Sequence, residues 1–399
     1  MNFSLRRNSF WLLLARLTAQ VLAILFIAVT ARKLGLNDFG HFAFIASILL
    51  VGNTFTNFGT DTFLVRDIAR AGHVTQLASQ SLSLQLILSA GFCIAIIFYR
   101  DPPLFLYTLA LFPLALYSVN NALLRALNRM DLFWLLSLAN GIIQVIAAYF
   151  SSDVLTLCLF LLIGQFLLSA LSISICTVSL PGFSLLPLKD FRPIFELTLP
   201  FAALTILLVL IQRLGVLSVS TLLGDSATGI FSSAARIVDG LKFGHYAILG
   251  ALLPALSRGS LESWQSFRKA FLFLMMVSLI FAIALVIFAN PIVVILYGKE
   301  FLPAVNQLSL LGWTLLPYTI SSFISYSLIA RGLEFTLVKA TAISLLIYVI
   351  LYFWLIHSSG LTGAIWTALV GECLQSVVFA LFYFACNRSI RSSTADRTR

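Results

Sequence analysis

Apolar residues run through this sequence in long stretches separated by short polar segments. Twelve stretches have the length and composition of a membrane-spanning helix, which needs about 20 apolar residues. The stretches lack the roughly ten-residue alternating pattern of the strands in a membrane barrel. Lipid offers no hydrogen-bond partners to the backbone, so each spanning segment must satisfy its own backbone groups, and the pattern therefore predicts helices. The predicted spans are residues 10–31, 39–60, 77–99, 104–124, 132–150, 154–178, 194–219, 230–253, 270–290, 303–328, 336–356 and 363–385.

The composition agrees with a polytopic membrane protein. The chain has 399 residues, of which 60% are hydrophobic and 10% are charged, and its mean hydropathy is +1.02. A soluble domain carries about 25% charged residues, so a soluble enzyme, a disordered chain and a disulfide scaffold are excluded. Twelve spans leave only short loops, which excludes a large catalytic domain outside the membrane. The first stretch lacks a small-residue cleavage site, and we interpret it as an uncleaved first helix.

The distribution of Lys and Arg predicts the orientation of the chain. With twelve spans both termini lie on one side, and that side carries Arg6, Arg7, Arg66, Arg70, Arg125, Arg129, Lys189, Arg192, Arg258, Arg268, Lys269, Arg331, Lys339, Arg388, Arg391, Arg397 and Arg399. The other side carries only Arg32, Lys33, Arg100 and Lys299. This bias predicts that both termini are cytoplasmic. It also accounts for most of the net charge of +10, so the charge does not indicate nucleic-acid binding.

The two halves of the sequence resemble each other at four places. The matches pair Leu34–Phe42 with Leu223–Phe231, Ala69–Gly72 with Ser257–Ser260, Ala126–Asp131 with Ala330–Glu334, and Gly164-Gln165 with Gly371-Glu372. Each match is weak, but the four occur in the same order. They predict a duplication of a six-span unit.

The duplication predicts the fold class and the domains. Six spans is an even number, so both halves start on the same side of the membrane and form a parallel repeat, as in transporters that alternate access around a cleft. We therefore expect an all-α polytopic membrane protein of two six-helix bundles with a central cleft. The expected bundles are residues 1–192 and 193–386, and residues 387–399 form a basic cytoplasmic tail that we expect to be disordered.

Arg16, Arg213, Arg236, Asp239 and Lys242 are charged residues that fall inside the predicted spans. A charge near the bilayer centre costs roughly 2.5–3.5 kcal/mol on insertion scales, so such residues face a polar cavity or one another. Asp239 lies three residues from Arg236 and from Lys242 and can pair with either on one helix. A structural ion pair explains Asp239 and one cation. It leaves about three positive charges, which favours a cationic cleft that binds an anion, and arginine is suited to phosphate.

Two carboxylates near or within the spans are candidates for coupling transport to an ion gradient. Glu372 lies near the middle of the twelfth span, and Glu196 lies near the start of the seventh. A buried carboxylate can carry a proton or hold Na⁺, although a glutamate at a helix start is also favoured by the helix dipole. No other cofactor is expected, because the spacing of the five cysteines fits neither a metal site nor a disulfide framework.

The N-terminal motifs resemble those of a known transporter family. The motifs are Asn8-Ser9-Phe10-Trp11, Thr30–Gly35, Asp38-Phe39-Gly40, Phe58–Asp61 and Val65–Arg70. They resemble the polysaccharide transporter family of the multidrug/oligosaccharidyl-lipid/polysaccharide (MOP) exporter superfamily. The resemblance extends over nearly the whole chain through its twelve spans and two halves, but it carries no catalytic signature and assigns no site residue.

The resemblance implies a Wzx-type flippase. Such a protein moves undecaprenyl-diphosphate-linked oligosaccharide units across the bacterial inner membrane for O-antigen, capsule or other surface polysaccharide. It implies the lipid-linked oligosaccharide and membrane lipid as partners, with a polysaccharide polymerase and a chain-length regulator as further candidates and no nucleic acid. The diphosphate is the anion that the in-span cations Arg16, Arg213, Arg236 and Lys242 favour independently.

Two other functions compete with this interpretation. A drug or cation exporter of the same superfamily would need a cavity with net acidic charge, and the in-span surplus here is basic. An integral-membrane polymerase or glycosyltransferase would need a sizeable external loop with acidic residues or histidine. The loops predicted here are short, so we do not expect an enzyme.

Overall fold

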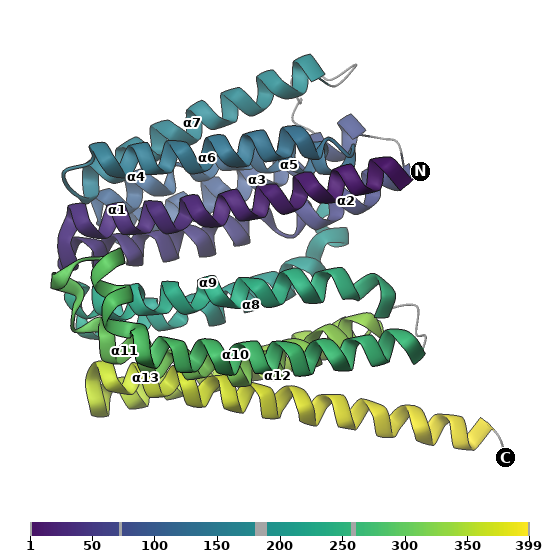
Figure 1. Ribbon diagram of the computed structural model, residues 1–399. Helices are drawn as coiled ribbons and strands as arrows, with labels where there is room; N and C mark the ends of the chain where they lie inside the picture. The colour runs from purple at the N-terminus through teal and green to yellow at the C-terminus, as the bar shows by residue number, and fades with distance from the viewer. Residues whose placement is uncertain (1, 72–73, 180–189, 257–260, 398–399) are drawn as a thin grey trace. The chain divides into compact units, whose positions relative to one another are not determined.

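A computed structural model describes residues 2–71, 74–179, 190–256 and 261–397, and every regular element in these ranges is helical (Figure 1). The all-α prediction is therefore confirmed. The elements are α1 (Asn2–Asn57), α2 (Thr60–Ala71), α3 (Val74–Ile97), α4 (Pro102–Thr108), α5 (Leu111–Ala126), α6 (Met130–Phe150), α7 (Val154–Ser179), α8 (Arg192–Leu223), α9 (Asp225–Leu256), α10 (Leu261–Leu296), η1 (Lys299–Phe301), α11 (Ala304–Leu311), η2 (Gly312–Thr314), α12 (Leu315–Ala330) and α13 (Glu334–Arg397).

The twelve predicted spans all fall on these helices. Among the described residues, nine helical stretches are long and apolar enough to cross a membrane. Two of the nine, in α1 and α13, are each divided by a glycine with non-helical backbone, Gly35 (φ 76°) and Gly360 (φ 58°). Both glycines lie in predicted loops, so each of these stretches supplies two spans. The nine stretches thus supply eleven spans. The remaining one, predicted at residues 230–253, is α9, whose charged and polar residues lower its hydropathy.

The chain divides into two compact units, one ending at Val209 and the other beginning at Leu210. This division falls inside α8, whereas the sequence prediction places it at 192/193, where α8 begins. At the other end, α13 continues as a helix to Arg397 through the tail that was expected to be disordered. Three of the basic residues used for orientation, Lys189, Arg258 and Arg399, lie outside the described residues.

The left-handed backbone positions repeat between the units. Gly35 (φ 76°) in the first unit and Gly224 (φ 82°) in the second both end the opening helix of their unit. They are equivalent in the sequence match between Leu34–Phe42 and Leu223–Phe231. Glycine tolerates this conformation because it has no Cβ. With these two positions aligned, the second part of α1 together with α2 corresponds to α9.

A second equivalent turn follows the fourth span of each unit. Asn128 (φ 59°) and Gly332 (φ 72°) occupy the left-handed position after α5 and α12. The next amide closes the turn in the same way in both, because Arg129 N donates to Leu124 O at 2.8 Å and Leu333 N donates to Leu328 O at 3.0 Å. This 6→1 bond is the Schellman helix ending. The match between Ala69–Gly72 and Ser257–Ser260 lies largely outside the described residues.

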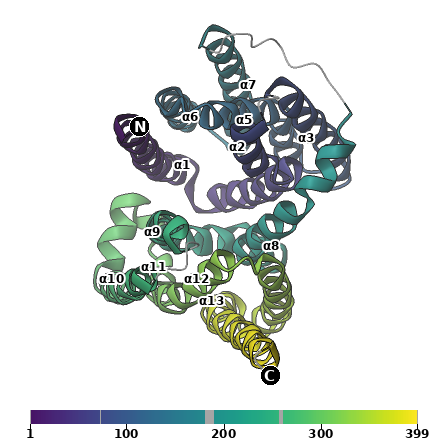
Figure 2. The ribbon, with the colours of Figure 1, turned by 90° about the vertical axis from the view of Figure 1, so that its right-hand side faces the viewer.

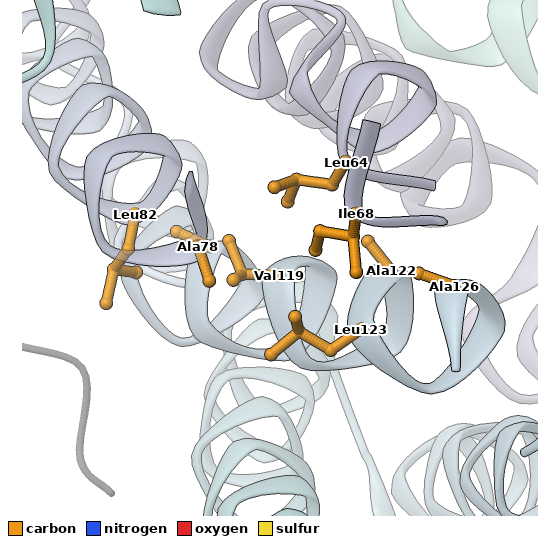
Figure 3. Packing of buried hydrophobic residues seen from close by; sticks show 9 residues of the cluster. Leu64, Ile68, Ala78, Leu82, Val119, Ala122, Leu123 and Ala126 are labelled. Carbon is orange, nitrogen blue, oxygen red and sulfur yellow. The ribbon is translucent and has the colours of Figure 1, made fainter. Parts of the chain in front are cut away.

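Each unit has its own apolar packing between helices, which are seen end-on in Figure 2. In the first unit α2, α3 and α5 meet in a cluster that includes Leu64, Ile68, Ala78, Leu82, Val119, Ala122, Leu123 and Ala126 (Figure 3). The small residues Ala78, Ala122 and Ala126 let the helices approach closely, as is typical of membrane bundles. In the second unit α9, α10 and α12 meet around Leu249, Leu256, Phe267, Leu274 and Phe323.

Candidate functional site

The charged residues inside the second unit form two ion pairs between helices. The guanidinium of Arg213 on α8 lies with its Nη2 3.6 Å from Oδ2 of Asp239 on α9. The ammonium of Lys242, one turn further along α9, lies 2.7 Å from Oε1 of Glu372 on α13. The side chains of Arg213, Lys242 and Glu372 are only 7%, 17% and 12% exposed. The two pairs therefore connect α8, α9 and α13 in a mostly buried setting, and we call Arg213, Asp239, Lys242 and Glu372 the charge network.

This pairing differs from the one expected from helix spacing. Asp239 was expected to pair with Arg236 or Lys242 on its own helix, but its ion-pair partner is Arg213 on the neighbouring α8. Lys242 is instead neutralised by Glu372, which lies 130 residues away in the sequence. The expected surplus of about three charges is therefore too large. Arg213, Arg236 and Lys242 stand against the carboxylates of Asp239 and Glu372, which leaves one positive charge among these five residues.

Several polar atoms of the network keep hydrogen-bonding capacity. Among the described residues, Arg213 Nε and Glu372 Oε2 are buried and make no hydrogen bond. The same holds for Oε1 of Gln375, one turn beyond Glu372 on α13. A buried polar group without a partner is costly and uncommon in folded proteins. The network therefore has donors and acceptors to offer to a ligand or an ion.

A polar cluster of Tyr318, His245, Ser278 and Thr319 lies beside the network, and none of its members is among the predicted site residues. Lys242 Nζ lies 4.7 Å from the centre of the Tyr318 ring, and that ring meets the imidazole of His245 edge to face at 5.4 Å. His245 Nε2 lies 3.0 Å from Ser278 Oγ and 2.9 Å from Thr319 Oγ1. His245 follows Lys242 by three residues, which places the two side chains about 60° apart around α9. Nothing in the sequence distinguishes Ser278 and Thr319 from the many other hydroxyl residues within spans.

The charges of α9 have no charged counterparts in the first unit. With Gly35 aligned to Gly224, the positions equivalent to Arg213, Arg236, Asp239, Lys242 and His245 are Ile24, Ser47, Leu50, Asn53 and Thr56. None of these is ionisable. The repeated fold therefore does not itself require charges at these positions.

The glycine before Glu372 also has an equivalent in the first unit. A Cβ on Gly371 would overlap the ring of Tyr348, and a Cβ on Gly164 would overlap the side chain of Ile143. Each glycine thus admits a bulky side chain from the preceding span. The residue after Gly164 is Gln165, whose Nε2 donates to Asn140 Oδ1 at 3.3 Å. The first-unit equivalent of Glu372 thus makes a neutral amide contact between α6 and α7.

The other two predicted site residues belong to the first unit. Arg16 lies on the first part of α1, and Glu196 lies near the start of α8. Both side chains are exposed. Neither residue takes part in an ion pair within the described part of the chain. The contacts of the charge network are thus confined to the second unit.

The fold is that of MOP superfamily transporters. The chain matches an inward-facing MATE family multidrug resistance transporter with a TM-score of 0.78 at 16% identity, covering 94% of this chain and 96% of that one. It matches the lipid II flippase MurJ with a TM-score of 0.74 at 16% identity, covering 94% and 86%. It matches a MOP superfamily transporter from Pyrococcus furiosus with a TM-score of 0.67 at 15% identity, covering 97% and 96%. Identities this low show the shared fold alone.

The family follows from the sequence match. The model of the polysaccharide biosynthesis protein family matches residues 5–260, more than half of the chain. A comparison with the curated proteins gives no match. The family match and the fold define a multi-pass membrane protein of the transporter and flippase type. The chain belongs to the polysaccharide biosynthesis protein family, which confirms the resemblance to the polysaccharide transporters of the MOP superfamily.

Proposed function

We propose that the chain flips undecaprenyl-diphosphate-linked oligosaccharide units across the bacterial inner membrane by alternating access, for O-antigen, capsule or another surface polysaccharide. The family match to polysaccharide biosynthesis proteins supports this substrate class. A flippase for another lipid-linked substrate, lipid II, has the same fold. The proposal includes cytoplasmic termini and action beside a polysaccharide polymerase and a chain-length regulator.

The observation that carries the proposal is the buried guanidinium of Arg213. Its side chain is 7% exposed, its carboxylate partner stands at 3.6 Å, and its Nε makes no hydrogen bond within the described part of the chain. A guanidinium binds phosphate oxygens in a bidentate manner, and such charge-assisted bonds are among the strongest in proteins. Arg213 is therefore suited to exchange Asp239 for a diphosphate. Arg236 and Lys242 are six residues apart on α9, which gives a rise of about 9 Å along the helix axis.

The Lys242–Glu372 pair is suited to couple this exchange to an ion gradient. Glu372 Oε2 is buried and lacks a hydrogen bond within the described part of the chain, so it can accept a proton or help to hold Na⁺. Either event reduces the attraction between Glu372 and Lys242. The ammonium then becomes available to the diphosphate, so ion binding and substrate binding become linked. Arg16 and Glu196, which lie in the first unit, are further candidates for headgroup and ion contacts.

The charge surplus argues against drug export as the main function. The shared fold does not decide the matter, since a MATE multidrug resistance transporter also has it. The Pyrococcus furiosus transporter has a binding pocket of reverse polarity that suggests a different function. Pocket charge is therefore a variable feature of this fold. Here Arg213, Arg236, Lys242, Asp239 and Glu372 together carry one positive charge, which favours an anionic substrate.

Surface-glycan export in a flippase-deletion strain tests the proposal. We expect Arg213→Ala to abolish export and Arg213→Lys to restore little, because a lysine keeps the charge but not the fork. The matched control is Arg66→Ala, which removes an exposed arginine that pairs with Asp67 at 2.9 Å. Full export by Arg213→Ala, with the protein inserted at normal levels, would refute the proposal. Normal export together with increased drug sensitivity would favour the exporter.

A further inference from the structure

A pocket of about 680 Å³ opens in the second unit between α10, α12 and α13. Its volume is in the range of small-molecule sites. Half of its ten lining residues are aromatic, namely Trp264, Phe267 and Phe271 from α10, Phe323 from α12 and Tyr383 from α13. None of these residues belongs to the charge network. The pocket therefore needs an explanation of its own.

Two adjacent cations also line this pocket. Arg268 and Lys269 follow one another on α10, and both are exposed. They belong to the side of the protein where the sequence places most Lys and Arg. Tryptophan and tyrosine are enriched at the membrane–water interface, so Trp264 and Tyr383 indicate the headgroup level of a leaflet. An anionic leaflet surface attracts such cations by about 1 kcal/mol each.

The rim of the pocket is held in place by Arg331, which follows α12. Its guanidinium lies 4.9 Å from the Trp264 ring centre and 4.8 Å from the Tyr383 ring centre. Its Nη2 also donates to Tyr383 Oη at 2.7 Å. Arg331 therefore connects the walls contributed by α10 and α13. This arrangement fixes a third cation against Trp264, which lies one turn before Arg268 on α10.

A buried hydroxyl in the same wall lacks a partner. Ser327 on α12 lines the pocket and is only 4% exposed. Its Oγ makes no hydrogen bond to any described residue. A buried hydroxyl without a partner costs free energy, which a ligand oxygen can offset. The pocket thus combines apolar walls, an unsatisfied donor and a cationic rim.

We propose that this pocket binds an anionic phospholipid of the surrounding bilayer. The aromatic walls suit an acyl chain, and the rim of Arg268, Lys269 and Arg331 suits a phosphate-bearing headgroup. A neutral lipid would not use the cations, and a soluble anion would not use the aromatic walls. The bound lipid would contact α10, α12 and α13 together and stabilise the second unit.

Quenching of Trp264 by brominated lipids tests this site. The full-length protein is placed in bilayers with equal fractions of phosphatidylglycerol and phosphatidylcholine, and only one of the two carries bromine. The Trp264 signal is the difference between the wild type and Trp264→Phe. We expect stronger quenching by brominated phosphatidylglycerol. That preference should fall about fivefold for each charge removed in Arg268→Gln/Lys269→Gln, as about 1 kcal/mol per charge implies.

The matched control is Arg32→Gln/Lys33→Gln, which removes an adjacent exposed basic pair of the first unit and should leave the preference unchanged. Equal quenching by the two brominated lipids would overturn the proposal, as would an unchanged preference in Arg268→Gln/Lys269→Gln. Loss of the quenching on addition of an isoprenoid diphosphate, but not of further phosphatidylglycerol, would also overturn it by assigning the pocket to the substrate. These outcomes are independent of whether Arg213 supports glycan export.

Discussion

Replacing the Arg213–Asp239 pair by the residues at the equivalent first-unit positions separates a structural ion pair from a functional one. The replacement is Arg213→Ile/Asp239→Leu, after Ile24 and Leu50. Exchanging a buried ion pair for apolar residues is often neutral or stabilising. Removing only Asp239 leaves Arg213, at 7% exposure, as an uncompensated buried charge, which costs about 3–5 kcal/mol. We therefore expect Asp239→Leu to be strongly destabilised and the double variant to be within about 1 kcal/mol of the wild type.

Thermal unfolding of the purified protein measures this difference. Each kcal/mol lowers the melting temperature by about 2–4 °C for a unit of this size, so Asp239→Leu should melt roughly 6–20 °C below the wild type. Glycan export is measured on the same variants. We expect the double variant to fold and to lose export, because the Arg213 guanidinium that is proposed to bind the diphosphate is gone. Normal export by the double variant would show that the Arg213–Asp239 pair has a structural role only. A double variant as unstable as Asp239→Leu would refute the energetic reasoning.

Three further predictions concern packing, topology and pH. Gly371→Ala should be destabilised by about 1–3 kcal/mol because its methyl group would overlap Tyr348, whereas Gly91→Ala, with open space around it, should not lose thermal stability. In a cysteine-free background, Ser152→Cys should react with an impermeant maleimide in intact cells and Leu127→Cys should not; the reverse pattern would invert the predicted orientation. The Thr156 amide donates to the Asp153 carboxylate at 2.7 Å, and this hydrogen bond lowers the pKa of Asp153. The hydrogen bond therefore stabilises the folded protein fully above the ordinary Asp pKa of about 3.9. This stabilisation is lost as the pH falls through the lowered pKa. Melting temperatures of Asp153→Ala and the wild type should differ at pH 7 and converge in acid.

Most of the fold could be predicted from the sequence, because lipid imposes a simple rule on the backbone. Apolar stretches bounded by charges, glycine and proline locate the twelve spans, including the four that are joined in pairs across Gly35 and Gly360 without a visible loop. The duplication was also visible, since equivalent turns need glycine or asparagine at the same places, as at Asn128 and Gly332. The interruption between α1 and α2 could not be predicted. Phe58 and Gly59 lie at the end of a predicted span, and their left-handed backbone has no strong local signal in the sequence.

The candidate site was predictable residue by residue but not pair by pair. An ionisable residue within a span is conspicuous, so Arg213, Asp239, Lys242 and Glu372 could all be named from the sequence. Their partners depend on which helices adjoin and how each is rotated. Spacing along α9 therefore favoured a local partner for Asp239 and left Glu372 alone. The two interhelical pairs, at 3.6 Å and 2.7 Å, result from the packing of helices against one another, which the residue spacing along one helix does not reveal.

The first unit also supplies the sharpest test of ion coupling at Glu372. Its equivalent there is Gln165, and the equivalent of Lys242 is Asn53, so Lys242→Asn/Glu372→Gln installs a pair of neutral residues that this fold already accommodates. Glu372→Gln alone would leave a mostly buried ammonium without its carboxylate and confuse instability with lost coupling. We expect the double variant to keep its melting temperature within a few degrees and to lose the dependence of transport on the proton or Na⁺ gradient. Transport by reconstituted vesicles with and without each gradient measures this dependence. If the double variant responds to the gradient as the wild type does, coupling lies outside the Lys242–Glu372 pair.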